Sequence, residues 1–204
     1  MGARSGGGAS GGMGSGSRSA GDASMRHLSA AAQKSFKKEE ESIRRQGVEY
    51  GIVMDEKGNV IWKGTDNSDA HVHYGTHRNN RITVHNHPIQ GQNKGRDRLD
   101  NGGSFSKADL MNAANGNALE SRVVTQKYTF SIRRPASGWK SSASNEGAYR
   151  RAKARVDRRI KKYYQATKND WETAGRRVLA TYWHLVAKEY AKAQGYTYTK
   201  TKIH

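Results

Sequence analysis

The stretch Arg81-Ile82-Thr83-Val84-His85-Asn86-His87-Pro88 predicts a β-strand that ends on two histidines. Its first residues alternate apolar and polar side chains, which is the pattern of a half-buried strand. Pro88 ends the strand because proline has no backbone N–H to donate to a neighbour. Side chains two residues apart on a strand leave the same face, so His85 and His87 can converge on one metal ion.

A glycine-rich segment and a short helix follow this strand. Residues 89–103 contain four glycines and many charges, and they predict a long loop of the kind that often forms a lid or a binding segment. Ser106 to about Asn115 predicts a helix that carries Asp109 in its first turn. Two imidazoles and one carboxylate, with one position left for water, form the ligand set of a catalytic zinc centre.

Two strings in this region resemble the H-x-H…S-x-x-D signature of the JAB/MPN (JAMM) metallopeptidases. They are His85-Asn86-His87-Pro88 and Gly102-Gly103-Ser104-Phe105-Ser106-Lys107-Ala108-Asp109, and this variant is similar to JAB-like domains of phages and prophages. The resemblance covers roughly residues 24–134. The basic segment 89–101 is an insertion relative to the signature, and we expect it to overhang the cleft.

The resemblance implies a role for each matching residue. His85, His87 and Asp109 would bind Zn²⁺, and Ser106 would help to stabilise an oxyanion. Glu49, in the predicted strand Val48–Met54, matches the glutamate that acts as general base in the family. A carboxylate beside a zinc-activated water can take its proton and later deliver it to a leaving amine.

Alternative interpretations of these motifs remain. Ser106 with Asp109 three residues later is also the pattern of a helix capping box, which is a structural feature. The string His-Asn-His suggests an HNH nuclease, but in that family the three residues stand far apart on a ββα unit. A second histidine cluster, His71, His73 and His77, lies in a polar loop, and we place it outside the site.

The rest of the chain predicts an α+β fold, with a small mixed sheet flanked by helices. Apolar residues at helical spacing predict a helix over 24–46, in which the acidic run Glu39–Glu41 would form the solvated face. The predicted strands are 48–54, 59–62, 81–85, 122–125 and 128–133.

Composition changes mark the expected boundaries of the chain's segments. A Gly/Ser-rich tail that we expect to be disordered would occupy 1–23, because it offers too little apolar surface to offset ordering entropy. The JAB/MPN-like metal-binding domain would span 24–135 and a linker 136–146. Two apolar stripes predict a basic helical hairpin over 147–195, and 196–204 would form a C-terminal tail.

Charge and residue usage narrow the function classes. The chain of 204 residues has 36 Lys and Arg against 18 Asp and Glu, a formal net charge of +18, which favours polyanionic partners such as nucleic acid. It has no cysteine, which excludes disulfides, thiol nucleophiles and cysteine–zinc sites. No stretch predicts a membrane span or a signal peptide, so we expect the protein in the host cytoplasm or in the virion.

Three functions therefore remain open. The first is a zinc-dependent hydrolase of amide or isopeptide bonds, of phage or prophage origin, with a peptide or protein substrate. The second is a non-catalytic, nucleic-acid-associated phage structural or morphogenesis protein, which would keep the fold while its basic segments bind nucleic acid. The third is a metal-dependent nuclease or toxin. The sequence does not indicate an oligomeric state.

Overall fold

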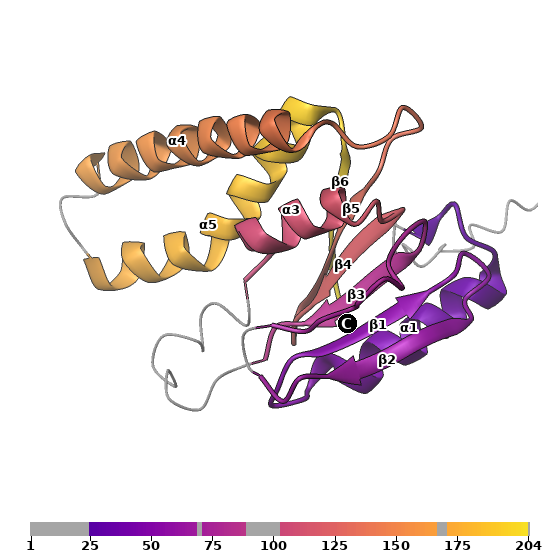
Figure 1. Cartoon of the computed structure of the whole chain (residues 1–204). Helices are drawn as coiled ribbons and strands as arrows, with labels where there is room; N and C mark the ends of the chain where they lie inside the picture. The colour runs from indigo at the N-terminus through magenta and orange to yellow at the C-terminus, as the bar shows by residue number, and fades with distance from the viewer. Residues whose placement is uncertain (1–24, 69–70, 89–102, 167–170, 204) are drawn as a thin grey trace, which may run out of the picture.

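The computed structural model describes residues 25–68, 71–88, 103–166 and 171–203. Within these ranges it confirms an α+β fold, with four helices and one mixed sheet of six strands (Figure 1). The expected tail 1–23 and the expected overhanging loop 89–101 lie outside the described residues. In chain order the elements are α1 (Ala30–Arg44), β1 (Tyr50–Met54), β2 (Val60–Thr65), β3 (Ile82–Asn86), α3 (Lys107–Asn115), β4 (Glu120–Val124), β5 (Tyr128–Arg133), α4 (Ser142–Ala166), α5 (Trp171–Gln194) and β6 (Thr197–Lys202).

The strand order is β2-β1-β3-β4-β5-β6, and only the β3–β4 pair is parallel among the strand pairs of the described chain. A parallel pair needs a crossover connection, and here the crossover includes α3. In the register of the antiparallel β1–β3 pair, Gly51 lies opposite His85. Tyr50 and the residue before β1, Glu49, are therefore placed close to the end of β3.

Helix α1 covers one face of the sheet (Figure 1). Ser29 caps it, because its hydroxyl oxygen accepts a hydrogen bond from the Ala32 N–H at 3.2 Å. Phe36 and Ile43 are fully buried against apolar residues of β1 and β3. Burial of one such side chain contributes about 1.5–3 kcal/mol, so this apolar stripe fixes the helix on the sheet.

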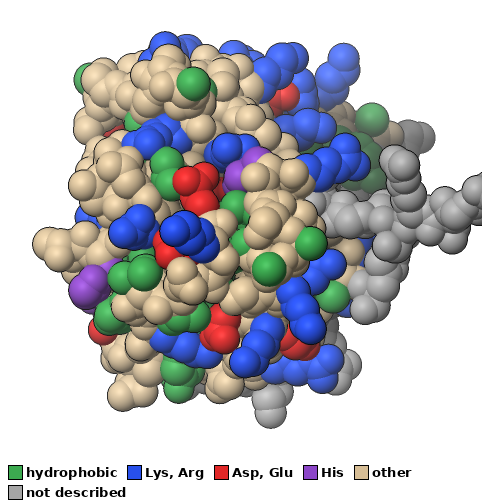
Figure 2. All heavy atoms as spheres, turned by 90° about the vertical axis from the view of Figure 1, so that its right-hand side faces the viewer, with side chains coloured by type: hydrophobic (Ala, Val, Ile, Leu, Met, Phe, Trp, Pro, Cys, Tyr) green, Lys and Arg blue, Asp and Glu red, His purple; other side chains and the backbone are tan. Residues whose placement is uncertain are grey.

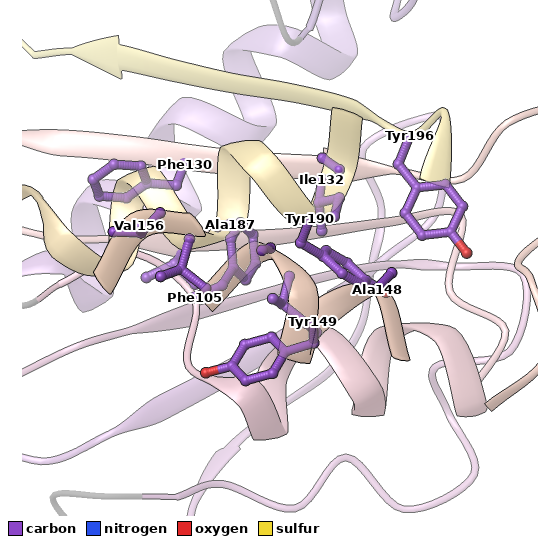
Figure 3. Close-up of a cluster of buried hydrophobic side chains, with 14 residues drawn as sticks. Phe105, Phe130, Ile132, Ala148, Tyr149, Val156, Ala187, Tyr190 and Tyr196 are labelled. Atoms are coloured by element: carbon purple, nitrogen blue, oxygen red, sulfur yellow. The ribbon is translucent and has the colours of Figure 1, made fainter. Parts of the chain in front are cut away.

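Helices α3, α4 and α5 cover the opposite face, where they share one hydrophobic core with β4 and β5 (Figure 3). Phe130 and Ile132 of β5 contribute the sheet side of this core, and Phe105 contributes from the segment just before α3. The helices contribute a buried stripe that consists of Ala148, Tyr149, Ala152, Val156, Val186, Ala187, Tyr190 and Ala191. None of the helices in the described ranges has the length and apolar character needed to span a membrane.

Two of the expected boundaries are wrong. Helix α4 begins at Ser142, inside the segment 136–146 that we expected to be a linker. Residues 197–202, which we expected to lie in a C-terminal tail, form β6 and pair antiparallel with β5. The strand forms because Gly195, at φ 74°, ends α5 and turns the chain back. Tyr196 then anchors it, since its ring packs edge-on against Trp139 with centroids 4.6 Å apart.

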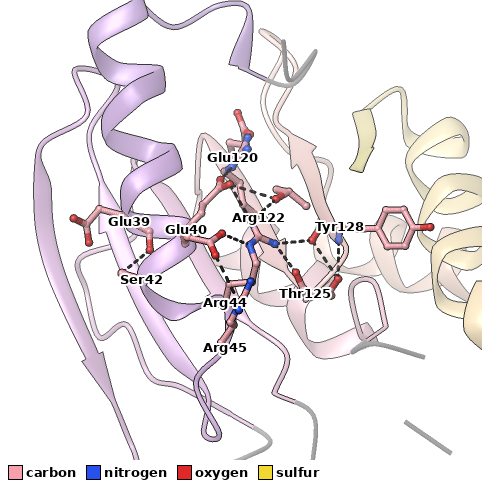
Figure 4. Close-up of polar contacts among 11 residues, drawn as sticks. Glu39, Glu40, Ser42, Arg44, Arg45, Glu120, Arg122, Thr125 and Tyr128 are labelled. Atoms are coloured by element: carbon pink, nitrogen blue, oxygen red, sulfur yellow. Dashed lines mark hydrogen bonds and ion pairs between the residues drawn. The ribbon is translucent and has the colours of Figure 1, made fainter. Parts of the chain in front are cut away.

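A buried ionic network joins α1 to the sheet, and it corrects the expectation that Glu39–Glu41 is wholly solvated (Figure 4). Glu40 is 3% exposed, and its carboxylate accepts a hydrogen bond from Nε of Arg122 at 2.6 Å. The same guanidinium donates to Glu120 at 2.6 Å. Arg44, also buried, donates to the carbonyl oxygen of Thr125. Buried charges need such partners, because removing an unpaired ion from water is costly.

Candidate metal centre

The structure brings His85, His87 and Asp109 together at the end of β3 and the start of α3. Nε2 of His85 lies 3.2 Å from Nε2 of His87. The Asp109 carboxylate presents one oxygen to each ring, at 3.4 Å from His85 and 3.5 Å from His87. One ligand atom from each of the three residues lies within 4.8 Å of the other two, so the group could hold one metal ion.

Each histidine is held by the sheet. His85 is 3% exposed and sits in β3 between β1 and β4. His87 follows the strand, and its N–H donates to the carbonyl oxygen of Val124 at 3.0 Å. Its ring Nδ1–H donates to the carbonyl oxygen of Gly103 at 2.7 Å, so in the neutral ring Nε2 is the unprotonated nitrogen, and Nε2 is directed at the cluster. Such a backbone partner on the distal nitrogen is typical of a metal-binding histidine.

Asp109 both caps α3 and completes the cluster. Its Oδ2 accepts a hydrogen bond from the Ser106 N–H at 2.7 Å, and the Ser106 hydroxyl oxygen accepts one from the Asp109 N–H at 3.1 Å. This is a complete capping box. Oδ1 remains directed at His85, so the structural and the metal-binding interpretations of this motif are compatible.

The charges of the cluster depend on one another. Burial opposes ionisation of Asp109, but the charges and hydrogen bonds of the two imidazoles outweigh it and hold the pKa of this carboxyl well below its usual range. Burial likewise lowers the pKa of His87, but the hydrogen bond and the charge of Asp109 reverse the effect, and the net pKa is raised. The carboxylate therefore stays ionised and attracts positive charge to this point.

Glu49 lines the same cavity, of about 90 Å³, as His85, Ser106 and Asp109. The side chain is largely buried, with an exposed fraction of 6% for the residue. Burial raises the pKa of its carboxyl, and the neighbouring imidazoles only partly offset this. A raised carboxyl pKa brings a group closer to the range in which it can exchange protons at neutral pH.

Asn86, between the two histidines, fixes the backbone on both sides of Glu49. Its Nδ2 donates to the carbonyl oxygen of Val48 at 3.1 Å, and its Oδ1 accepts from the Tyr50 N–H at 2.6 Å. The Glu49 N–H in turn donates to the carbonyl oxygen of Ser68 at 2.7 Å. No sequence pattern predicted this role of Asn86, although its position between the two histidines of the motif is a signal that could have identified it.

A loop between β2 and β3 supplies further residues that line the cavity and that were not predicted from the sequence. His71, Tyr74 and Arg78 all line it. We had placed His71 outside the site, but it lies at the cavity that holds Glu49. No periodic pattern marks this loop, so its position over the sheet could not be inferred from spacing.

A second group with metal-binding residue types lies beside the first. Asp66, His71 and His73 place one ligand atom each within 4.8 Å of the others, but all three are exposed. The carboxylate of Asp66 already accepts hydrogen bonds from the backbone N–H of His73 at 2.8 Å and from its ring at 2.7 Å. This group is therefore more solvated than the cluster at His85.

The buried cluster fits a catalytic rather than a closed structural metal site. It offers two imidazole nitrogens and a carboxylate, and a cavity with an acidic side chain lies next to them. Three protein ligands with an open position is the arrangement of catalytic zinc sites. Comparisons with models of protein families, with curated proteins and with solved structures found no match.

Proposed function

We propose that this protein is a zinc-dependent hydrolase of amide or isopeptide bonds, of the JAB/MPN type and of phage or prophage origin. The observation that carries the proposal is the convergence of His85, His87 and Asp109 with Glu49 at one cavity. The resemblance to the H-x-H…S-x-x-D signature supports the same assignment. A peptide or protein is the corresponding substrate.

The side chains at the cavity would have separate roles in the hydrolysis. Zinc, when bound, supplies a Lewis acid and lowers the pKa of water towards neutrality. Glu49 accepts the proton of the attacking water and later delivers it to the leaving amine. The Ser106 oxygen already accepts from the Asp109 N–H, so its own hydroxyl proton is available to the oxygen of the attacked carbonyl.

The test combines metal analysis with cleavage of quenched fluorescent peptides and of a lysine-linked isopeptide. We expect about one zinc per chain, lost when His85 and His87 are changed to Ala. Glu49→Gln should keep the zinc and lower kcat by roughly 100-fold or more. Glu56→Gln is the matched control, because Glu56 lies on the same hairpin and is exposed. A protein without zinc, unaffected by the histidine substitutions, would overturn the proposal.

A second candidate function is association with nucleic acid, and a surface of α4 favours it. Three exposed cations form one row along the helix, at spacings of seven and four residues: Arg151, Arg158 and Lys162. They form no ion pair within the described part of the chain, and they extend along about 17 Å of helix. Lys and Arg side chains are also common on the face in Figure 2. A linear array of this kind fits the regularly spaced charges of a phosphate backbone.

Charge reversal tests this second candidate. Arg151→Glu, Arg158→Glu and Lys162→Glu together should weaken binding to duplex DNA or to RNA, and should reduce the slope of log K against log salt by about 3. The control reverses three exposed lysines of α1, which are Lys34, Lys37 and Lys38. Equal effects of the two sets would mean that only net charge matters. If the protein cut nucleic acid and Glu49→Gln abolished the cutting, a nuclease would replace the peptidase.

A further inference from the structure

Arg78 lines the cavity of the metal centre, together with Glu49, His85 and Asp109. It belongs to the loop that precedes β3 and is half-buried. Tyr74 lies among these charged groups: burial raises the pKa of its hydroxyl, the charges of Asp109 and Glu49 raise it further, and Arg78 acts to lower it. A cation thus stands at the same cavity as two carboxyl groups.

The side chain of Arg78 packs against Gly116, the C-cap residue of α3. A Cβ added to Gly116 would overlap Cγ, Cδ and Nε of Arg78. The arginine stem therefore lies directly on the glycine backbone, which only a residue without a side chain permits. The contact runs from Cγ to Nε, the first atom of the guanidinium, so it restricts where the rest of this group can go.

The guanidinium of Arg78 has no side-chain partner among the described residues that would explain its position. No described residue forms an ion pair or a side-chain hydrogen bond with Arg78, in contrast to the buried Arg44 and Arg122. The last turn of α3 does not need it as a cap. The carbonyl oxygens of Asn112, Ala113 and Ala114 already accept from the backbone N–H groups of residues 116–118.

We propose that Arg78 binds a carboxylate of the substrate beside the bond that is cleaved, so that the preferred substrate is an acidic peptide. This inference rests on the proposed hydrolase function. The planar guanidinium can pair with a carboxylate through two parallel hydrogen bonds. A carboxylate carries one negative charge, and it is therefore repelled less than a phosphate dianion by Glu49 and Asp109 in the same small cavity. The carboxylate is either an acidic side chain or the C-terminus of a chain.

One arm of the test needs no metal. The Nε–Hε resonance of Arg78 is followed by NMR during titration with propanoate, with propanamide as the uncharged analogue and methyl phosphate as the competing anion. We expect propanoate to shift the resonance and propanamide to leave it unchanged. A larger response to methyl phosphate than to propanoate would overturn the preference for carboxylate.

The second arm uses the zinc-loaded protein and hydroxamates, which chelate zinc through two oxygens. Hydroxamates with a terminal carboxylate after two to four methylene groups are compared with their methyl esters. For the best chain length the acid should bind roughly tenfold more tightly than the ester. The ratio should fall to about one in Arg78→Gln and in Gly116→Ala, and it should persist in Gly47→Ala, where an added Cβ meets nothing within 4 Å.

The possible results distinguish failure of the carboxylate site from failure of the proposed hydrolase function. If hydroxamates bind but acid and ester bind equally well, or if the ratio persists in Arg78→Gln, the carboxylate site is refuted while the metal centre stands. If the protein binds no zinc, the hydrolase is refuted, and the propanoate titration alone decides whether Arg78 binds carboxylates. To distinguish the two sources of carboxylate, peptides that end in a free or an amidated C-terminus are cleaved in parallel with peptides that carry internal Glu.

Discussion

Replacement of Arg122 by Met should destabilise the protein strongly, although Arg122 lies outside the cavity of the metal centre. The guanidinium is 1% exposed and bridges Glu40 of α1 and Glu120 of β4, with both contacts at 2.6 Å. Met has an unbranched, flexible side chain and no charge, so the substitution leaves two buried carboxylates without their shared cation.

The expected cost follows from what remains after the substitution. Among the described residues, Glu40 then keeps Arg44, at 3.8 Å, and the Thr129 hydroxyl at 3.3 Å, whereas Glu120 keeps the Ser131 hydroxyl at 2.6 Å and His27 at 3.5 Å. Removing one partner of a buried ion pair costs about 3–5 kcal/mol. For a chain of this size the midpoint of thermal unfolding should fall by roughly 6–20 °C.

Urea unfolding followed by circular dichroism measures the effect at pH 7. Lys153→Met is the matched control, because it removes a cation from the exposed pair with Asp157, where a loss below about 1 kcal/mol is expected. A triple variant with Glu40→Gln, Glu120→Gln and Arg122→Met should recover part of the loss, since no buried charge then stays unpaired. A loss for Arg122→Met as small as that for Lys153→Met would refute the reasoning.

Two further predictions concern a histidine and an asparagine. Burial, with Lys200 and Lys188 nearby, lowers the pKa of His184 to about 4. The unfolded chain takes up this proton below about pH 6.5 and the folded chain does not, so His184 favours unfolding as the pH falls from 6.5 towards 4. His184→Gln should recover roughly 2 kcal/mol of the unfolding free energy lost over that range, a figure reduced for the solvent screening of a partly exposed ring. Urea titrations at each pH measure it, and identical pH profiles would contradict it. Asn86→Ala should cost about 2–3 kcal/mol, because it leaves backbone groups beside Glu49 unpaired. It should also lower kcat while zinc content stays at the wild-type level, and an unchanged kcat would show that Asn86 does not position Glu49.

The sequence predicted the elements whose signals are local. The alternation in Arg81–Val84 predicts β3, and Ser106 with Asp109 predicts the start of α3, because strand periodicity and helix capping act within a few residues. These local patterns do not depend on knowing the rest of the fold. The convergence of Asp109 with the histidine pair is not local, because the segment 89–103 lies between them, and it was expected from the zinc ligand set and from the resemblance to the H-x-H…S-x-x-D signature.

Features that depend on distant partners could not be predicted in this way. The burial of Glu40 follows from Arg122, which lies 82 residues away in the chain. Strand β6 lacks a clear apolar alternation, since Thr and Lys residues dominate it, and it forms because an edge of β5 is available for pairing. Arg78 enters the cavity because of a glycine at the end of another element, and no spacing rule connects the two.

The most direct test of the metal centre is anomalous X-ray diffraction at the zinc absorption edge, from crystals of the full chain grown with one equivalent of zinc. The predicted result is one strong peak bound by Nε2 of His85, Nε2 of His87 and the carboxylate of Asp109, at about 2.0–2.2 Å from each. No peak at this position, or a peak only at the exposed group Asp66, His71 and His73, would contradict the account.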